Sequence, residues 1–290
     1  TRAYIKIQDG CNNYCAYCII PYLRGPVRSR SVASVVQEAA RLAAAGYKEI
    51  VLNGINLSSY GRDLKTGENL LSVLRAVHAL PGIERIRLGS LEPVVITQEF
   101  VSALSKLPKA CRHFHLSLQS GCSSVLARMN RRYTTEEFYA AVERLRALYP
   151  DCALSADIIV GFPGETEEEF EETVRFAEKV GFAWVHVFAY SVREGTAAAK
   201  MNAQISSEIK QKRSARLIAV CREIGRAYRE RFVGREVTVL CQQAEEGKAS
   251  GLTDEHLEVE FSCGNAQINS LIRVRVTGVT ENGLCAEALE

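Results

Sequence analysis

The sequence has no apolar run of the length that a membrane span needs, about 20 residues. It also has little net charge, +2, so the overall balance argues neither for nor against a nucleic-acid partner. No signal-like segment precedes the first predicted strand, which begins at residue 2. We therefore expect a cytoplasmic protein that does not enter a membrane. We also expect a fragment of a longer chain, because the first strand starts so abruptly.

A disulfide framework is not expected, although ten cysteines are present. Disulfide-rich scaffolds are usually small secreted domains, whereas this chain has 290 residues. Most of the cysteines are scattered through apolar segments, which favours reduced and mostly buried thiols. These scattered cysteines are Cys111, Cys122, Cys152, Cys221, Cys241, Cys263 and Cys285.

The other three cysteines, Cys11, Cys15 and Cys18, lie within one stretch of eight residues. Thiolate is a soft ligand that selects iron–sulfur clusters, zinc or copper(I). No fourth ligand is nearby, because the next cysteine is Cys111 and the first histidine is His78. Three thiolates leave one iron of a four-iron cluster open, so this loop predicts a reactive site rather than a closed structural one.

Up to about residue 200, β-rich runs alternate with amphipathic helical stretches, which predicts repeated βα units around a parallel sheet. The predicted strands are 2–8, 49–54, 85–90, 113–119, 153–161 and 184–190. The predicted helices lie near 31–45, 68–80, 97–107, 134–149, 165–180 and 206–231. Thr97 and Thr134 are expected to cap two helix starts, and Gly181 to end a helix.

Residues that follow the strands of a parallel sheet are functional candidates, because ligands bind beyond the carboxyl ends of such strands. Polar residues and glycines gather at these positions, on the same edge as the three cysteines. The candidates include Asn53, Gly54, Asn56, Ser90, Glu92, Gln119 and Asp157. Residues 161–166 follow the fifth strand and are either part of this edge or only a turn that caps the next helix.

The pattern changes near residue 232, where helical periodicity stops. Short alternating runs at 236–240, 256–261 and 271–279 predict a small antiparallel barrel or sandwich. We therefore divide the chain into two domains, 1–231 and 232–290. Nine basic residues in the segment 208–235 form either an RNA contact or a solvated helix face.

A Cys-x3-Cys-x2-Cys loop directly after the first strand resembles the radical S-adenosylmethionine (SAM) superfamily, in which an aromatic residue, here Tyr17, precedes the last cysteine. The resemblance implies an α/β fold, an open partial TIM-like (β/α)6 barrel. It implies that the three cysteines hold a 4Fe-4S cluster whose open iron chelates SAM. It also implies SAM contacts from Asn53 and Gly54, with Tyr17 near the adenine. From their location, Ser90, Gln119 and Asp157 are further candidates. A structural zinc loop remains the alternative.

The chain also resembles, over nearly its whole length, the methylthiotransferase family, which adds a methylthio group to tRNA or to a ribosomal protein. The segments that carry the resemblance are 21–25, 28–30, 59–61, 118–121, 129–133, 157–165 and 190–196. Residues 53–61, 116–121 and 186–196 look most like members that act on N6-threonylcarbamoyladenosine beside the tRNA anticodon. Residues 232–290 are similar to the TRAM domain, an RNA-binding module, so the small all-β barrel is expected to be TRAM-like.

Two departures from this family affect the expected function. The family carries an N-terminal domain with a second, auxiliary 4Fe-4S cluster associated with sulfur insertion, and this chain has no such region. Ala198 stands where the family usually has proline, which is expected to loosen that loop without affecting the chemistry.

The sequence therefore predicts a radical SAM methylthiotransferase that modifies N6-threonylcarbamoyladenosine in the anticodon stem-loop of tRNA. Its electron donor would be a protein such as flavodoxin or ferredoxin. This chain alone is expected to cleave SAM without modifying tRNA. Two alternatives remain: a methylthiotransferase acting on an aspartate of a ribosomal protein, and a non-catalytic RNA-binding protein with a zinc-stabilised loop.

Overall fold

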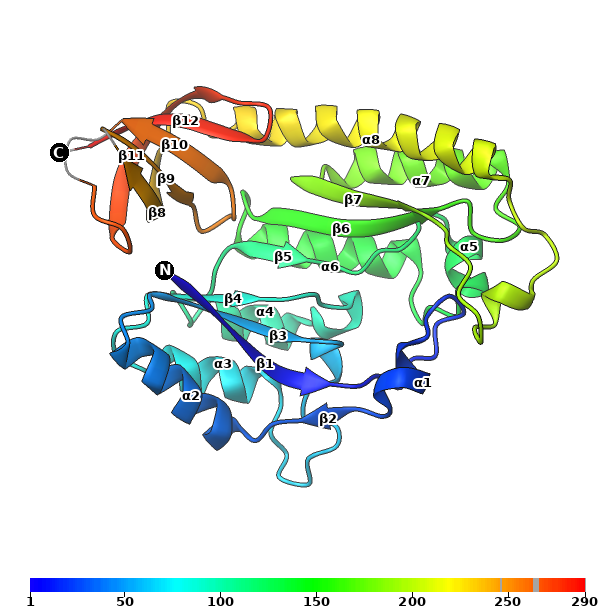
Figure 1. The fold of residues 1–290 in the computed structure, drawn as a ribbon, viewed down its shortest axis with the longest axis horizontal. Coiled ribbons are helices and arrows are strands. Elements are labelled where there is room, and N and C mark those ends of the chain that lie inside the picture. Colours follow the sequence, from blue (N-terminus) through cyan, green and yellow to red (C-terminus); the bar gives the residue numbers. More distant parts are fainter. Residues whose placement is uncertain (246, 263–265, 290) are drawn as a thin grey trace.

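Six parallel strands form an open barrel in the computed structural model, which describes residues 1–245, 247–262 and 266–289 (Figure 1). The strands are β1 (Arg2–Asp9), β3 (Glu49–Gly54), β4 (Arg85–Leu88), β5 (His113–His115), β6 (Ala153–Val160) and β7 (Trp184–Ala189). The sets β1-β3-β4 and β5-β6-β7 are joined by isolated bridges at Ile86–Ala110 and Leu91–Leu116. A two-residue antiparallel strand, β2 (Arg28–Ser29), extends the edge at β1.

Helices cover the outer face of this barrel (Figure 1). They are α2 (Val32–Ala44), α3 (Leu70–His78), α4 (Gln98–Leu104), α6 (Thr135–Leu148), α7 (Glu167–Val180) and α8 (Ser207–Glu230). Thr97 and Thr134 accept hydrogen bonds from the third residue of their helices, and Gly181 ends α7 in the left-handed conformation, as predicted. The short elements α1 (Ile20–Arg24), α5 (Ser123–Arg128), η1 (Leu57–Ser59), η2 (Pro93–Val95) and η3 (Ala198–Lys200) were not predicted.

Side chains along each strand point alternately into the helix-facing core and to the concave face of the barrel. On β1, Ile5 and Ile7 are fully buried against the helices, whereas Tyr4 between the core positions is exposed. On β6, Ile158 belongs to the same core, and Asp157 lies on the opposite face. The concave face is therefore polar and open enough to receive a ligand.

Five further strands close into a small barrel after α8: β8 (Glu236–Glu245), β9 (Lys248–Leu252), β10 (Glu258–Ser262), β11 (Leu271–Val279) and β12 (Gly283–Ala288). The α/β open barrel followed by a small all-β barrel confirms the expected fold class. The strands β9 and β12 were missed, and both contain a glycine at a close backbone approach. A Cβ on Gly251 would lie 2.1 Å from the Leu240 carbonyl oxygen, and one on Gly283 2.4 Å from that of Glu258. The domain boundary after residue 231 stays a prediction.

The scattered cysteines are mostly buried. Cys111, Cys122, Cys152 and Cys221 are free and buried, Cys241 is buried, and Cys285 is free and half-buried. Cys263 lies outside the described residues. No helix in the described part of the chain is long and apolar enough to cross a membrane.

The closed barrel packs against the end of the open barrel that lies opposite the cysteines (Figure 1). Buried Arg85 donates to the carbonyl oxygens of Leu252 and Thr238, both at 2.7 Å. Arg87 donates to Glu49 at 2.8 Å and also to the carbonyl oxygens of Thr253 and Asp254. Guanidinium groups of β4 thus satisfy backbone acceptors of the second barrel.

We expect Arg85→Leu to lower the free energy of unfolding by about 2–4 kcal/mol, because the carbonyl groups of Leu252 and Thr238 and the Asp254 carboxylate lose a buried charged donor. Urea unfolding measures the change. The matched control is Arg112→Leu, whose side chain is 57% exposed and lies 3.9 Å from Asp254. Exposed pairs contribute about 1 kcal/mol at most. Equal losses in both variants would contradict this account of the interface.

Candidate active site

The three cysteines lie on the loop that follows β1, at the carboxyl ends of the strands. All three are free, with Cys15 buried and Cys11 and Cys18 half-buried. The Cys11 amide donates to the Gly25 carbonyl oxygen at 3.1 Å, and Tyr14 adopts a positive φ of 49°. Burial and the neighbouring Cys15 and Cys11 raise the pKa of the Cys18 thiol. The loop therefore brings soft donors together at one edge.

Arg131, which follows α5, is the charged group closest to these thiols in the described structure. Its Nη1 donates to Cys15 Sγ at 3.2 Å, its Nε to Tyr133 Oη at 3.0 Å, and its Nη2 lies 2.9 Å from Glu92 Oε1. Burial disfavours its charge, but Tyr133, Tyr17 and Cys15 raise the pKa of Arg131 above its ordinary value. A buried cation thus lies against a candidate cluster ligand.

Glu92 and Asn56 complete this network from the ends of two other strands. Asn13 donates to Glu92 at 2.7 Å, and Asn56 Nδ2 lies 3.5 Å from Glu92 Oε2 and 3.9 Å from Cys11 Sγ. The Asn56 Oδ1 atom is buried and accepts no hydrogen bond from any described residue. Because buried polar atoms are normally paired, Asn56 presents an acceptor for a ligand.

A separate apolar cluster holds the other side of the loop. Ala16 packs with Phe162, Tyr190 and Ala198, and Tyr17 packs against the same cluster. The Ala198 amide also donates to the Ala16 carbonyl oxygen at 2.8 Å. This hydrogen bond argues against the loosening expected at Ala198, because an alanine here supplies a donor that proline lacks.

The turn after β6 is held by a buried ion pair. Glu165 accepts the amides of Gly161 and Phe162 at 2.7 and 3.2 Å and pairs with Arg213 of α8 at 3.1 Å. Thr166, rather than Glu165, caps α7. The Lys210 side chain crosses the turn so closely that a Cβ on Gly161 would lie 2.2 Å from its Cγ. These contacts therefore hold the backbone of the turn in place next to Phe162.

The candidates Asn53, Gly54, Ser90 and Gln119 lie at this edge, and Asp157 lies within β6 on the concave face, but the structure gives none of these five a direct contact with the thiols. Asn53 Oδ1 accepts the Gly54 amide at 2.8 Å, and Ser90 is half-buried. Gln119 has a positive φ of 69° and its amide donates to the Asp157 carbonyl oxygen at 2.8 Å. Asp157 Oδ2 lies 3.4 Å from His115 Nε2.

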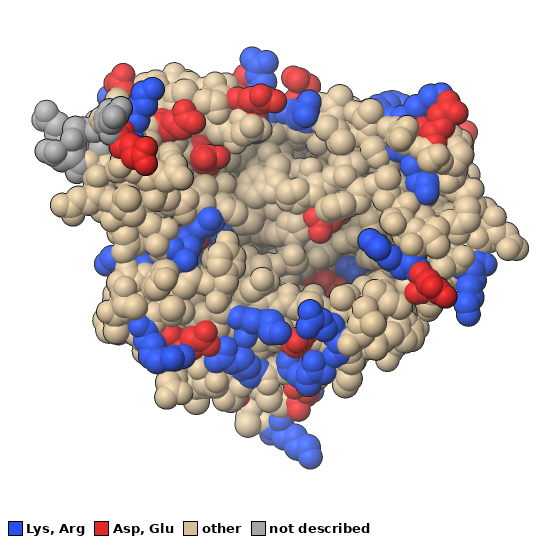
Figure 2. All heavy atoms as spheres, viewed as in Figure 1, with Lys and Arg blue, Asp and Glu red and all other residues tan. Residues whose placement is uncertain are grey.

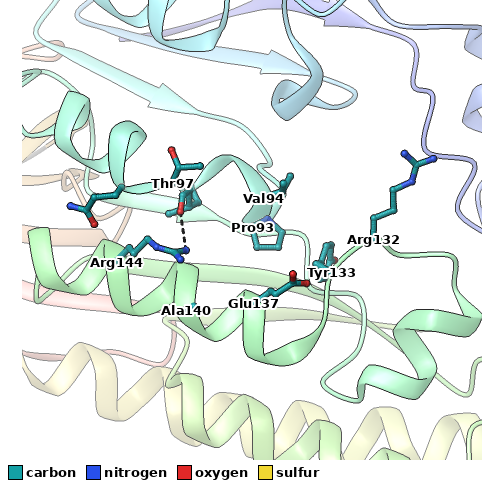
Figure 3. A pocket seen from close by; sticks show the side chains of 10 residues that line it. Pro93, Val94, Thr97, Arg132, Tyr133, Glu137, Ala140 and Arg144 are labelled. Atoms are coloured by element: carbon teal, nitrogen blue, oxygen red, sulfur yellow. Dashed lines mark hydrogen bonds between the residues drawn. The ribbon is translucent and has the colours of Figure 1, made fainter.

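Asn56, Glu92 and Arg131 contact the thiols or one another. Asn56 and Glu92 were candidates by their position after a strand but were not predicted as SAM contacts, and Arg131 was not a candidate. Two of them were visible as polar residues after a strand, but no local pattern marks Arg131, which lies 116 residues from Cys15 in the chain. A cavity of about 100 Å³ lies beside Cys15, between Glu92 and Arg131. A larger one of about 380 Å³ lies on the outer face between η2 and α6, where no cysteine lines it (Figure 3).

The donor set fits a four-iron cluster. In the described residues, no group of three His, Cys, Asp or Glu side chains is placed to hold a single metal ion. The thiolates of a cluster bind different irons, so they need not meet at one point. Three free cysteines on one loop, with an unpaired acceptor and a buried ion pair beside them, fit such a cluster together with a zwitterionic ligand.

Comparison with known proteins defines the class. A family profile described as the radical SAM superfamily matches residues 5–177. Two solved structures share the fold. The methyltransferase TsrM of Kitasatospora setae has a TM-score of 0.56 and 22% sequence identity, and the match covers 68% of this chain and 38% of that chain. The Escherichia coli coproporphyrinogen III oxidase HemN has a TM-score of 0.54 and 19% identity, and the match covers 77% of this chain and 52% of that chain.

The chain is also similar to curated tRNA-modifying enzymes. A tRNA-2-methylthio-N(6)-dimethylallyladenosine synthase of Alkaliphilus oremlandii is 39% identical over 100% of this chain and 62% of its own length. The threonylcarbamoyladenosine tRNA methylthiotransferase MtaB of Bacillus subtilis is 40% identical over 95% of this chain and 62% of its own length. The chain belongs to the radical SAM superfamily, is similar to these tRNA methylthiotransferases and spans about three fifths of their length. This membership confirms the expected cofactors, a 4Fe-4S cluster and SAM.

We expect Ala198→Pro to lower the free energy of unfolding by about 1–2 kcal/mol and to speed amide exchange in residues 13–18, because the donor to Ala16 is lost. Hydrogen–deuterium exchange measures the local effect. Ala197→Pro is the matched control, since Ala197 has a φ of −62° that suits proline and its amide donates to no described residue. Equal exchange in the two variants would refute a role for the Ala198 amide.

Proposed function

We propose that this chain is the radical-generating and RNA-contacting part of a tRNA methylthiotransferase. One observation carries the proposal: a buried guanidinium, Arg131, donates to Cys15 on a loop with three free thiols. The relatives' names describe tRNA enzymes, which favours RNA over a ribosomal protein as the substrate. Because the chain spans part of those relatives, the complete reaction belongs to the proposal as well.

Cys11, Cys15 and Cys18 would hold the cluster in this proposal. The amino-acid end of SAM carries an ammonium and a carboxylate, which complement Glu92 with Asn56 and Arg131, respectively. Asn53, Gly54, Ser90, Gln119 and Asp157 remain candidates for the rest of SAM, with Tyr17 near its adenine. When bound, the reduced cluster and SAM supply a 5'-deoxyadenosyl radical.

The side chains around the loop position these groups and limit their exposure to water. Arg131 fixes the Cys15 side chain and offsets negative charge at the thiolates. Phe162 and Tyr190, both buried, cover one side of the loop. Figure 2 shows a deep hollow on the open side of the barrel, which would admit a base from RNA. The electron would come from a carrier protein such as flavodoxin or ferredoxin.

The finer proposal is that the base is N6-threonylcarbamoyladenosine beside the anticodon. MtaB carries that base in its name, whereas the Alkaliphilus relative carries the dimethylallyl base, so the relatives leave both open. The two substituents differ in charge, since the threonyl group ends in a carboxylate. The polar concave face, with His115, Asp157 and His186, favours the charged substituent.

The RNA-contacting surface is proposed around the mouth of the hollow and on the TRAM-like barrel. Along α8 and its exit, most of the basic residues are neutralised by acidic partners, which makes this segment a weaker candidate. The paired residues are Lys212, Arg213, Arg216, Arg226, Arg231 and Arg235. Arg24, Arg62 and Arg132 near the cysteine loop are exposed and have no acidic partner within 4 Å in the described residues. They are free to contact phosphates.

The proposal predicts that anaerobic reconstitution with iron and sulfide produces visible charge-transfer absorption and reductive cleavage of SAM to 5'-deoxyadenosine. Replacing Cys11, Cys15 and Cys18 together by alanine should abolish both, because no other described cysteine lies on that loop. Absorption spectra and chromatography of the nucleoside products measure the two effects. Cys285→Ala, in the closed barrel, is the control. Absorption that survives the triple substitution would rule out this cluster site.

The proposal also predicts salt-dependent binding of tRNA. Replacing Arg24 and Arg132 by glutamine should weaken binding and flatten the dependence of log Kd on log salt, because each lost phosphate contact lowers the slope by roughly 0.7–0.9. Filter binding over a range of salt measures this. Arg216→Gln and Arg231→Gln on α8, both already ion-paired, form the matched control. An unchanged slope in the first pair would place the RNA elsewhere.

A further inference from the structure

The edge strand β7 presents an exposed face to the hollow. Val185 and Val187 pack into the core under the helices, so Trp184, His186 and Phe188 lie on the opposite, concave face. Phe188 is 53% exposed and His186 is also exposed. An aromatic ring beside an imidazole, both open to a concave surface, is suited to a ligand with a flat apolar face and a polar edge.

His186 lies at the end of a polar row across three strands. It is the register partner of Asp157 on β6. Asp157 Oδ2 lies 3.4 Å from His115 Nε2, and the other ring nitrogen of His115 shares a hydrogen bond with Ser155 Oγ at 3.0 Å. The rings of His115 and His186 are 6.3 Å apart. The Asp157 carboxyl group thus contacts the His115 ring, whereas the His186 side chain forms no hydrogen bond or ion pair with any described residue.

The other cations of the concave face are engaged. Lys6 pairs with Asp9 at 2.8 Å. Arg85 and Arg87 donate to backbone carbonyl groups of the closed barrel, and Arg87 also pairs with buried Glu49. Among the described residues of β1, β4 and β7, His186 is thus the exposed nitrogen donor that no acidic side chain occupies.

We propose that His186 determines substrate choice by donating a hydrogen bond to the carboxylate of the threonylcarbamoyl group, while Phe188 packs against the base. This inference rests on the proposed function and names a residue that selects its substrate. The neighbouring Asp157 carboxyl group contacts the His115 ring at 3.4 Å rather than His186. A dimethylallyl group offers no acceptor to His186, so the imidazole discriminates between the two substituents.

Three synthetic anticodon stem-loops test the proposal, identical except that the target adenosine is unmodified, N6-threonylcarbamoylated or N6-dimethylallylated. Fluorescence anisotropy at one salt concentration gives Kd for the reconstituted protein. The wild-type chain should prefer the threonylcarbamoyl stem-loop to the unmodified one by about tenfold, the effect of one hydrogen bond to a charged group. His186→Leu should remove this preference, and His186→Lys, which keeps a nitrogen donor, should retain it.

His78→Leu is the matched control, because His78 ends α3 on the outer face of the barrel and should leave the preference at its wild-type value. A wild-type chain without the preference, or a His186→Leu chain that keeps it, would overturn the proposal. Weaker SAM binding in His186→Leu would also overturn it, by assigning the imidazole to the SAM carboxylate. Formation of 5'-deoxyadenosine reports separately on the proposed radical chemistry, so failure of either claim can be recognised.

Discussion

The buried contact between Arg131 and Glu92 is the interaction on which the candidate site depends. It lies between the cysteine loop after β1, the end of β4 and the segment after α5, and it touches each of them. A buried ion pair stabilises a fold only when its remaining donors are satisfied. Here Arg131 Nη1 donates to Cys15 and Nε to Tyr133, whereas the buried Nη2 has only the ion-pair contact with Glu92. The network therefore holds three separate chain segments in one arrangement while leaving the Asn56 acceptor unpaired.

Buried arginines also lie at the opposite end of the barrel, where they have different partners. Arg85 and Arg87 also lie buried on the concave face, but carbonyl groups of the closed barrel occupy their donors. One end of the barrel is thus closed by backbone acceptors. At the other end, charged and unpaired groups lie beside free thiols, which is where a polar ligand gains most from binding. Buried arginines therefore support the fold at one end of the barrel and the candidate site at the other.

The strands, the outer helices and their caps could be predicted because local patterns encode them. Thr134 with Glu137 is a capping box in both sequence and structure. The grouping of Arg131 with Cys15 could not be predicted, since it joins residues that only the fold brings together. The left-handed backbone conformation of Gln119 could not be predicted either, because glutamine rarely adopts a positive φ. Short elements such as α5 fell below the length at which periodicity is informative.

Charge on α8 illustrates why a count of residues does not define a binding surface. The sequence places nine basic residues between 208 and 235, yet α7 supplies Glu167 and Glu171 to two of them, and Asp151 pairs with both Arg231 and Arg235. Arg213 is buried against Glu165 and so supports the turn behind Phe162. A cation that already has a carboxylate partner gains little from a phosphate, because the first pair must be broken. The helix therefore contributes mainly to the architecture of the site, whereas Arg24, Arg62 and Arg132 near the cysteine loop have no acidic partner within 4 Å among the described residues.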